Sequence, residues 1–201
     1  RASEHRWPSL GSERATPLES PAKPRRVGNV SKGRLEAFSD GVLAIIITIM
    51  VLELKVPHGD DLATLFKLWP VFFSYILSFL YVGIYWNNHH HLMHTVKTVS
   101  GGILWSNLHL LFWLSLIPFS TGWVGENHFG QWTIFVYALN LFMCAIAYTI
   151  LVLRIKAVHG AGSEIDRAIG SDTKGKVSLV CYVAAMAASF FLPVAGLMLT
   201  V

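Results

Sequence analysis

The sequence contains little charge and almost no cysteine. Only 14% of its 201 residues are charged and 53% are hydrophobic, and its mean hydropathy is positive. A soluble globular domain carries about 25% charged residues, so the composition indicates an integral membrane protein. The two cysteines, Cys144 and Cys181, lie within apolar runs and lack the spacing of a disulfide framework or a zinc site. We interpret them as small buried apolar residues.

The motifs of common enzyme classes are also missing. The chain contains no Gly-x-Ser-x-Gly nucleophile elbow, no complete phosphate-binding loop and no His-Glu-x-x-His pair. No RNA- or DNA-binding motif accompanies the basic residues. The sequence therefore predicts neither an enzyme nor a nucleic-acid partner.

Long apolar runs follow a polar N-terminal segment. Residues 1–33 contain four prolines, several serines and no apolar periodicity, which is typical of a disordered tail. In the remainder, 34–201, we predict an all-α fold with five to six transmembrane helices. The predicted spans are about 37–56, 65–87, 103–123, 132–153 and 177–192. The last segment, 193–201, either continues the fifth helix beyond a kink at Pro193 or begins a sixth, incomplete span.

Basic residues are distributed unequally between the two ends of these spans. Of the 16 Lys and Arg residues, all except Lys55 and Lys67 lie before the first span, after the second or after the fourth. The positive-inside rule then predicts a cytoplasmic N-terminus, and we expect a multi-pass protein of the cell membrane. The positive net charge is explained by this topology and by anionic lipid headgroups.

The first apolar run begins with polar residues that need an explanation. Arg34, Ser39 and Asp40 precede or enter it, and an unpaired charge inside the bilayer is strongly unfavourable. One interpretation is that Ser39 and Asp40 only serve the first helical turn, where a carboxylate meets the positive end of the helix dipole. The other is that Asp40 has a partner on another span.

The same run also has one narrow face with a single hydroxyl. Gly41, Ile45, Thr48 and Leu52 are separated by four, three and four residues, which places them on one side of a helix. Such a face either lines a pore or forms a packing seam between membrane helices. The spacing alone does not distinguish these alternatives.

The start of this run resembles the transmembrane protein 175 family of potassium channels, specifically its bacterial single-repeat branch. The family signature Arg-x-x-x-Phe-Ser-Asp is matched here by Arg34, Phe38, Ser39 and Asp40. The resemblance implies six spans per chain and a homotetramer whose central pore is lined by the first helix. It also implies that the pore-lining positions are Ile45, Thr48 and Leu52.

A histidine-rich stretch, residues 86–94, ends the second run at the same side of the bilayer as Asp40. By resemblance, groups here bond to the Phe-Ser-Asp segment, and that role falls on Trp86, Asn88 and His89. His90 and His94 are four residues apart, as in helical zinc sites. However, no cysteine lies near them and residues 62–125 contain no carboxylate, so we expect no metal and no other cofactor.

Together these features predict a potassium-permeable cation channel. No Thr-Val-Gly-Tyr-Gly filter is present, so selection by a column of backbone carbonyls is not expected. Rings of Ile45 and Leu52 would instead form dry constrictions, and Thr48 hydroxyls would replace part of the hydration of K+. The expected partners are further copies of the chain, membrane lipids and permeant K+.

Three alternatives accompany this prediction. The chain could be a small cation or proton-coupled transporter that uses Asp40 and the His89–His94 cluster. Glu53 and Lys55 near the outer end of the first span are either solvated interface charges or a ring that attracts cations. His109 is more typical of a hydrogen-bonded packing residue than of a haem ligand.

Overall fold

The computed structural model describes residues 31–160 and 173–200, and every regular element in these ranges is a helix. The expected tail, 1–33, lies outside the described residues except for its last three positions. The helices are α1 (Lys32–Leu52), α2 (Leu62–Phe66), α3 (Trp69–His94), α4 (Gly101–Ser115), α5 (Ile117–Glu126), α6 (Gln131–His159), α8 (Thr173–Ala188) and α9 (Pro193–Met198). The prediction of an all-α chain is therefore confirmed.

Four helical stretches in the described part of the chain are long and apolar enough to cross a membrane. They are α1, α3, the combined α4 and α5 stretch Gly101–Glu126, and α6. α8 has 16 residues, fewer than the roughly 20 that a span needs. The length criterion therefore supports four spans, and a fifth and sixth remain predictions.

The helix boundaries differ from the sequence-based ones for local reasons. α1 starts at Lys32 because the carbonyl of Ser31 accepts from the backbone N–H groups of Arg34 and Leu35 at 3.0 and 3.2 Å. It ends at Leu52 rather than at 56, since the residue before Pro57 is disfavoured in helical geometry. Glu53 and Lys55 therefore lie beyond the helix.

The second and fourth predicted spans are also shifted at their ends. The segment before Trp69 forms the separate helix α2, which Asp61 caps by accepting from the Thr64 N–H at 3.1 Å. α3 then continues beyond 87 to His94, so the histidine cluster lies on the helix itself. α6 extends past 153 and ends at Gly160, whose φ of 79° suits glycine.

The third span is two helices rather than one. α4 and α5 meet at Leu116, and Pro118 lies in the first turn of α5. Proline has no N–H to continue the helical ladder. The backbone N–H of Leu116 donates to the carbonyl of Trp113, three residues earlier, at 3.2 Å. This spacing is that of a 3₁₀ turn, which is tighter than a turn of α-helix.

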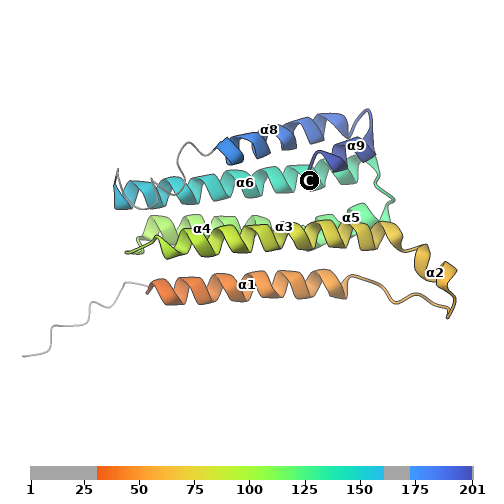
Figure 1. Cartoon of the computed structure of the whole chain (residues 1–201), viewed down its shortest axis with the longest axis horizontal. Coiled ribbons are helices and arrows are strands. Elements are labelled where there is room, and N and C mark those ends of the chain that lie inside the picture. The colour runs from red at the N-terminus through yellow and green to blue at the C-terminus, as the bar shows by residue number, and fades with distance from the viewer. Residues whose placement is uncertain (1–30, 161–172, 201) are drawn as a thin grey trace, which may run out of the picture.

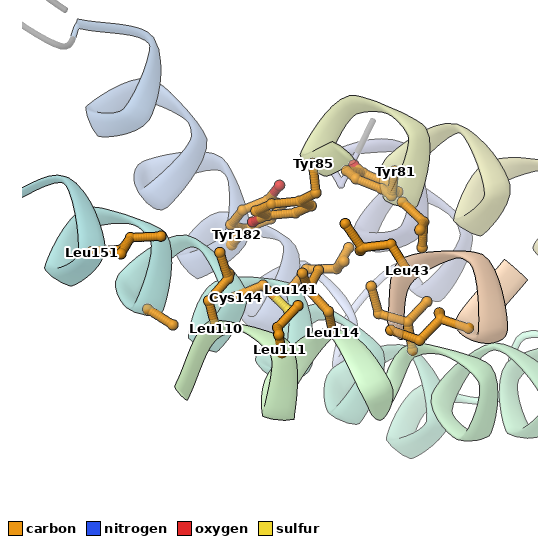
Figure 2. Close-up of a cluster of buried hydrophobic side chains, with 14 of the residues drawn as sticks. Leu43, Tyr81, Tyr85, Leu110, Leu111, Leu114, Leu141, Cys144, Leu151 and Tyr182 are labelled. Carbon is orange, nitrogen blue, oxygen red and sulfur yellow. The ribbon is translucent and has the colours of Figure 1, made fainter. Parts of the chain in front are cut away.

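The helices form a layered bundle in which α1 lies at one edge and α8 at the other (Figure 1). α1 packs against α3, α4 and α5, whereas α6 contacts α4, α5 and α8. Figure 2 shows the apolar core between these layers, where Tyr85 and Tyr182 lie next to each other and leucines from several helices converge. Cys144 is buried in this core, as predicted, and Cys181 is partly buried; both are free thiols.

Two glycines allow helices to approach closely. A Cβ at Gly125 of α5 would lie 2.8 Å from Val71 Cα of α3, a distance that excludes any other residue without movement of the backbone. A Cβ at Gly196 of α9 would lie 3.0 Å from Ala185 O of α8. α9 therefore folds back against α8, so the chain turns before Pro193 rather than continuing as one long kinked helix.

Candidate pore-lining helix and its anchoring network

α1 has two distinct faces. Its buried residues recur every three or four positions and are Leu35, Ser39, Leu43, Ile46 and Met50. The opposite face points away from the rest of the chain: Ile45 is 59% exposed, Leu52 is 76% exposed, and Thr48 is also exposed. The three predicted pore-lining residues thus share an uncovered face of a helix at the edge of the bundle.

Thr48 has its hydroxyl hydrogen occupied within its own helix. The Thr48 Oγ1 donates to Ala44 O at 2.9 Å, a common arrangement for threonine in helices. Because the hydrogen points along the helix, the oxygen lone pairs are left to face outward. The exposed face of α1 therefore presents a hydrogen-bond acceptor between two apolar side chains, which suits a cation rather than an anion.

The buried side of α1 is tied to α4 and α3 by a chain of polar groups. Ser39, fully buried, donates its hydroxyl to Leu35 O at 2.9 Å and accepts from Asn107 Nδ2 at 2.9 Å. Asn107 Oδ1 faces His89 Nε2 at 2.7 Å. Because the amide oxygen only accepts, His89 donates from Nε2, which fixes its tautomer. Every member of this chain has a partner.

Asp40 has a partner on another span. The Trp86 Nε1–H of α3 donates to Asp40 Oδ1 at 3.1 Å, and the Trp86 ring stacks on His90 with centroids 5.8 Å apart. The side chains of Asp40 and Trp86 are both exposed. Asp40 is therefore not merely a first-turn residue, since a specific donor from a distant part of the chain meets its carboxylate.

The other residues of the predicted network are placed differently. Phe38 is 53% exposed on the same side of α1 as Ile45, and Arg34 is exposed, with no ion pair among the described residues. Asn88 is exposed too, and it contributes only its backbone carbonyl, which accepts from the Tyr148 hydroxyl at 3.3 Å. The structure thus brings Trp86 and His89 to the Ser39–Asp40 segment but not the side chain of Asn88.

Asn107 is the functional residue that sequence reasoning did not assign. It is fully buried and bridges Ser39 and His89, so His89 reaches α1 only through it. A carboxamide within an apolar run was the available signal, because a buried amide requires partners. Its partners lie 68 and 18 residues away in sequence, which no local pattern reveals.

By contrast, His109 accepts from Trp113 Nε1 at 2.9 Å on the same helix, as expected of a packing histidine.

At the opposite end, the chain following α1 is tied to α5. Lys55 Nζ forms an ion pair with Glu126 Oε1. The hydrogen bond and charge of Glu126 raise the pKa of Lys55. Beside this pair, Glu53, Lys67 and His128 help to line a cavity of about 370 Å³. Glu126 therefore offsets the positive charge of Lys55 within the chain.

The chain is similar to known proteins. The sequence pattern of the family described as Endosomal/lysosomal potassium channel TMEM175 matches residues 34–118, which include α1 from Arg34 onward and all of α2, α3 and α4. A protein named as a potassium channel from Chryseobacterium sp. (strain P1-3) is 59% identical over 164 residues, covering 82% of this chain and 85% of that relative. One from Streptomyces collinus is 35% identical over 127 residues, covering 59% and 62% of the two chains.

A solved structure shows the same fold. The crystal structure of a lysosomal potassium-selective channel TMEM175 homolog from Chamaesiphon minutus has a TM-score of 0.74 and 28% sequence identity to this chain. The match covers 84% of this chain and 92% of that one. With the close relative from Chryseobacterium, it confirms the resemblance inferred from the Arg-x-x-x-Phe-Ser-Asp signature. The chain is a multi-pass membrane protein and belongs to the TMEM175 family.

Proposed function

We propose that this protein is a potassium-permeable channel in which four copies of α1 surround a central pore. The observation that carries the proposal is the uncovered face of α1, where Ile45 and Leu52 are among the exposed large hydrophobic residues. One helix cannot enclose a path for ions, so the chain must assemble about an axis along the bilayer normal. The relatives are named as potassium channels, which indicates K+ as the permeant ion and supports a channel rather than an enzyme.

In the proposed pore, Ile45 and Leu52 form two apolar rings. A narrow ring of branched side chains excludes water when closed and so stops ions without any charged gate. When the ring widens, ions pass according to how readily they lose water, and K+ loses water more readily than Na+. The preference therefore arises without a backbone-carbonyl filter, and no cofactor is required.

Thr48 lies between these rings and supplies the polar step. Its outward oxygen lone pairs, left free by the bond to Ala44 O, replace part of the hydration of K+ as the ion crosses the apolar section. Four copies form a ring of neutral acceptors, which attracts cations without binding them so tightly that they fail to leave. Selectivity and throughput are then set by the same three side chains.

The anchoring network keeps this face in register. Ser39, Asn107 and His89 fix the rotation of α1 about its own axis at the end near the N-terminus, while Trp86 holds Asp40. If α1 rotated, the buried Ser39 face would replace the pore face. In this proposal the N-terminus is cytoplasmic, the protein lies in the cell membrane in contact with lipid, and six spans complete each subunit.

Single-channel recording tests the proposal. The purified chain, reconstituted in a planar bilayer with K+ on one side and Na+ on the other, is expected to give unitary currents whose reversal potential favours K+. A proton-coupled transporter that uses Asp40 and the His89–His94 cluster would instead show saturable counterflow and no unitary events. Native mass spectrometry checks the assembly, and a monomer or dimer as the conducting species would contradict a four-fold pore.

A further inference from the structure

We propose that His90 and His94, on adjacent turns of α3, form a binding site for a divalent transition-metal ion such as Zn2+ or Cu2+. It does not depend on the channel function, and it departs from the sequence-based expectation of no metal because the structure brings the two imidazole nitrogens together. The two side chains are exposed, and their Nε2 atoms face each other at 3.1 Å. Imidazole nitrogens are ordinary ligands of both metals.

The distance between the two nitrogens fits a metal ion. With zinc–nitrogen bonds of about 2.0–2.1 Å, two ligands at a right angle lie about 2.9 Å apart, and at a tetrahedral angle about 3.4 Å apart. The separation of 3.1 Å lies between these values. Both nitrogens can therefore bind one ion once the proton between them is lost and each ring turns to direct its lone pair at the ion.

The site is preorganised by its neighbours. His90 stacks on Trp86 with ring planes 26° apart, and Trp86 is itself held by Asp40. His94 meets His90 at a ring-centroid distance of 4.5 Å. Because both histidines are on one helix, no loop has to close around the ion, and their relative positions are set by helix geometry.

Nearby charge is balanced. Lys32 Nζ donates to the backbone carbonyl of His94 at 3.2 Å, but Glu36 lies 3.7 Å from the same ammonium group. Within the described ranges, no group of three or more histidine, cysteine or acidic side chains is placed to hold a metal ion. The remaining coordination positions therefore belong to water, and the ion exchanges with solvent as expected of a site with two protein ligands.

His91 provides a matched control. It is exposed on the same turn as His90 and its ring contacts that of His90, but among the described residues it makes no hydrogen bond to His94 like the one that His90 makes. A metal that only associates with exposed imidazoles would respond to the loss of His91 as strongly as to the loss of His90. A metal bound between His90 and His94 would not.

The experiment uses the full chain in detergent, without an affinity tag, titrated with Zn2+ by calorimetry and with Cu2+ by electron paramagnetic resonance. We expect one exchangeable ion per chain, with nitrogen hyperfine splitting from two imidazoles. His90→Ala and His94→Ala should each weaken binding at least about tenfold, the lower bound reported even for outer-shell partners of a metal. His91→Ala should leave both measurements unchanged.

Equal Zn2+ affinity and an unaltered Cu2+ spectrum in the His90→Ala/His94→Ala double variant would overturn the proposal. So would an equal loss of affinity in the His91→Ala protein. Size-exclusion profiles and melting temperatures of all variants are compared first, because exposed histidines should be replaceable without loss of the fold. If the single variants fail this check, His90→Gln serves instead, since glutamine keeps a polar side chain at the position.

Discussion

Asn107 Nδ2 lies 2.9 Å from Ser39 Oγ, and this one hydrogen bond connects α4 to the buried face of α1. On its other side, the same carboxamide accepts from His89 of α3. A single side chain thus holds three helices in register. In apolar surroundings, each of these polar groups finds its hydrogen-bond partner in the others.

The first prediction concerns that bridge. Asn107→Leu keeps the size of the side chain but leaves His89 Nε2–H and one lone pair of Ser39 without partners. We expect the free energy of unfolding to fall by about 1–3 kcal/mol, the usual cost of leaving a buried polar group without a hydrogen-bond partner. The measurement is the melting temperature of the assembled protein in detergent and the fraction of oligomer retained. Asn88→Leu, at an exposed carboxamide, is the control; an equal effect of both substitutions would contradict the assigned role.

The second prediction concerns the apolar ring. Ile45→Asn replaces an exposed branched side chain by a hydrated one, so the constriction should stay wet and pass more Na+ as well as K+. Flux of both ions from reconstituted vesicles is the measurement. Ile45→Val, which remains apolar, should keep the closed state tight. Unchanged permeation in the Ile45→Asn protein would remove Ile45 from the pore.

The third prediction concerns the hydroxyl on the same face. Thr48→Ala removes the outward oxygen without adding charge, so the K+ preference should fall while conduction persists. The reversal potential between K+ and Na+ solutions should therefore move toward zero. Thr48→Ser, which retains the oxygen and its bond to Ala44 O, should preserve the preference. Identical reversal potentials in all three proteins would show that Thr48 does not contact the ion.

The fourth prediction tests the close approach of α5 to α3. Gly125→Ala places a methyl group 2.8 Å from Val71 Cα, and such overpacking typically costs about 1–3 kcal/mol. The melting temperature in detergent should therefore fall. Gly122→Ala is on the same helix with nothing within 4 Å of its added Cβ, so it should be neutral or slightly stabilising. Similar melting temperatures of the two variants would contradict the packing argument.

The fifth prediction follows from the ion pair between Lys55 and Glu126. Glu126 raises the pKa of Lys55 above its ordinary value of 10.5. Lys55 therefore stabilises the folded state fully at pH values below its pKa in the unfolded chain, and this contribution is lost as the pH rises through its pKa in the folded chain. Glu126→Gln removes the negative charge beside Lys55, so the pKa of Lys55 should fall. Lysine-selective NMR titration measures it.

Glu53→Gln is the matched control for the ion pair, because the charge of Glu53 has the smaller influence on Lys55. The pKa of Lys55 should fall less in this variant than in Glu126→Gln. A larger fall in the Glu53→Gln protein would show that Glu126 is not the main partner.

The sequence was sufficient to find the important helix and its outward face. The spacing of Ile45, Thr48 and Leu52 follows directly from helical periodicity, and the structure leaves that face uncovered. The need of Asp40 for a partner followed from the cost of a charge near the bilayer. These features depend on short-range geometry and on solvation, both of which are readable from neighbouring residues.

Other features could not be read in this way. The ends of α3 and α6 extend past the apolar runs because a helix continues outside hydrocarbon as long as nothing breaks it, as α3 does to His94. The break between α4 and α5 at Leu116 is due to Pro118. A proline is also common in the first turn of an ordinary helix, so its presence alone does not reveal a break. The bridge through Asn107 depends on how three spans meet, which is a property of tertiary packing alone.

The interruption at Leu116 has a mechanical consequence for α1. One end of α1 is tied to Asn107 of α4, and the segment just past its other end is tied to Glu126 of α5. The two attachments are thus on opposite sides of a joint. Any bend between α4 and α5 would therefore move one attachment relative to the other and change the tilt of α1.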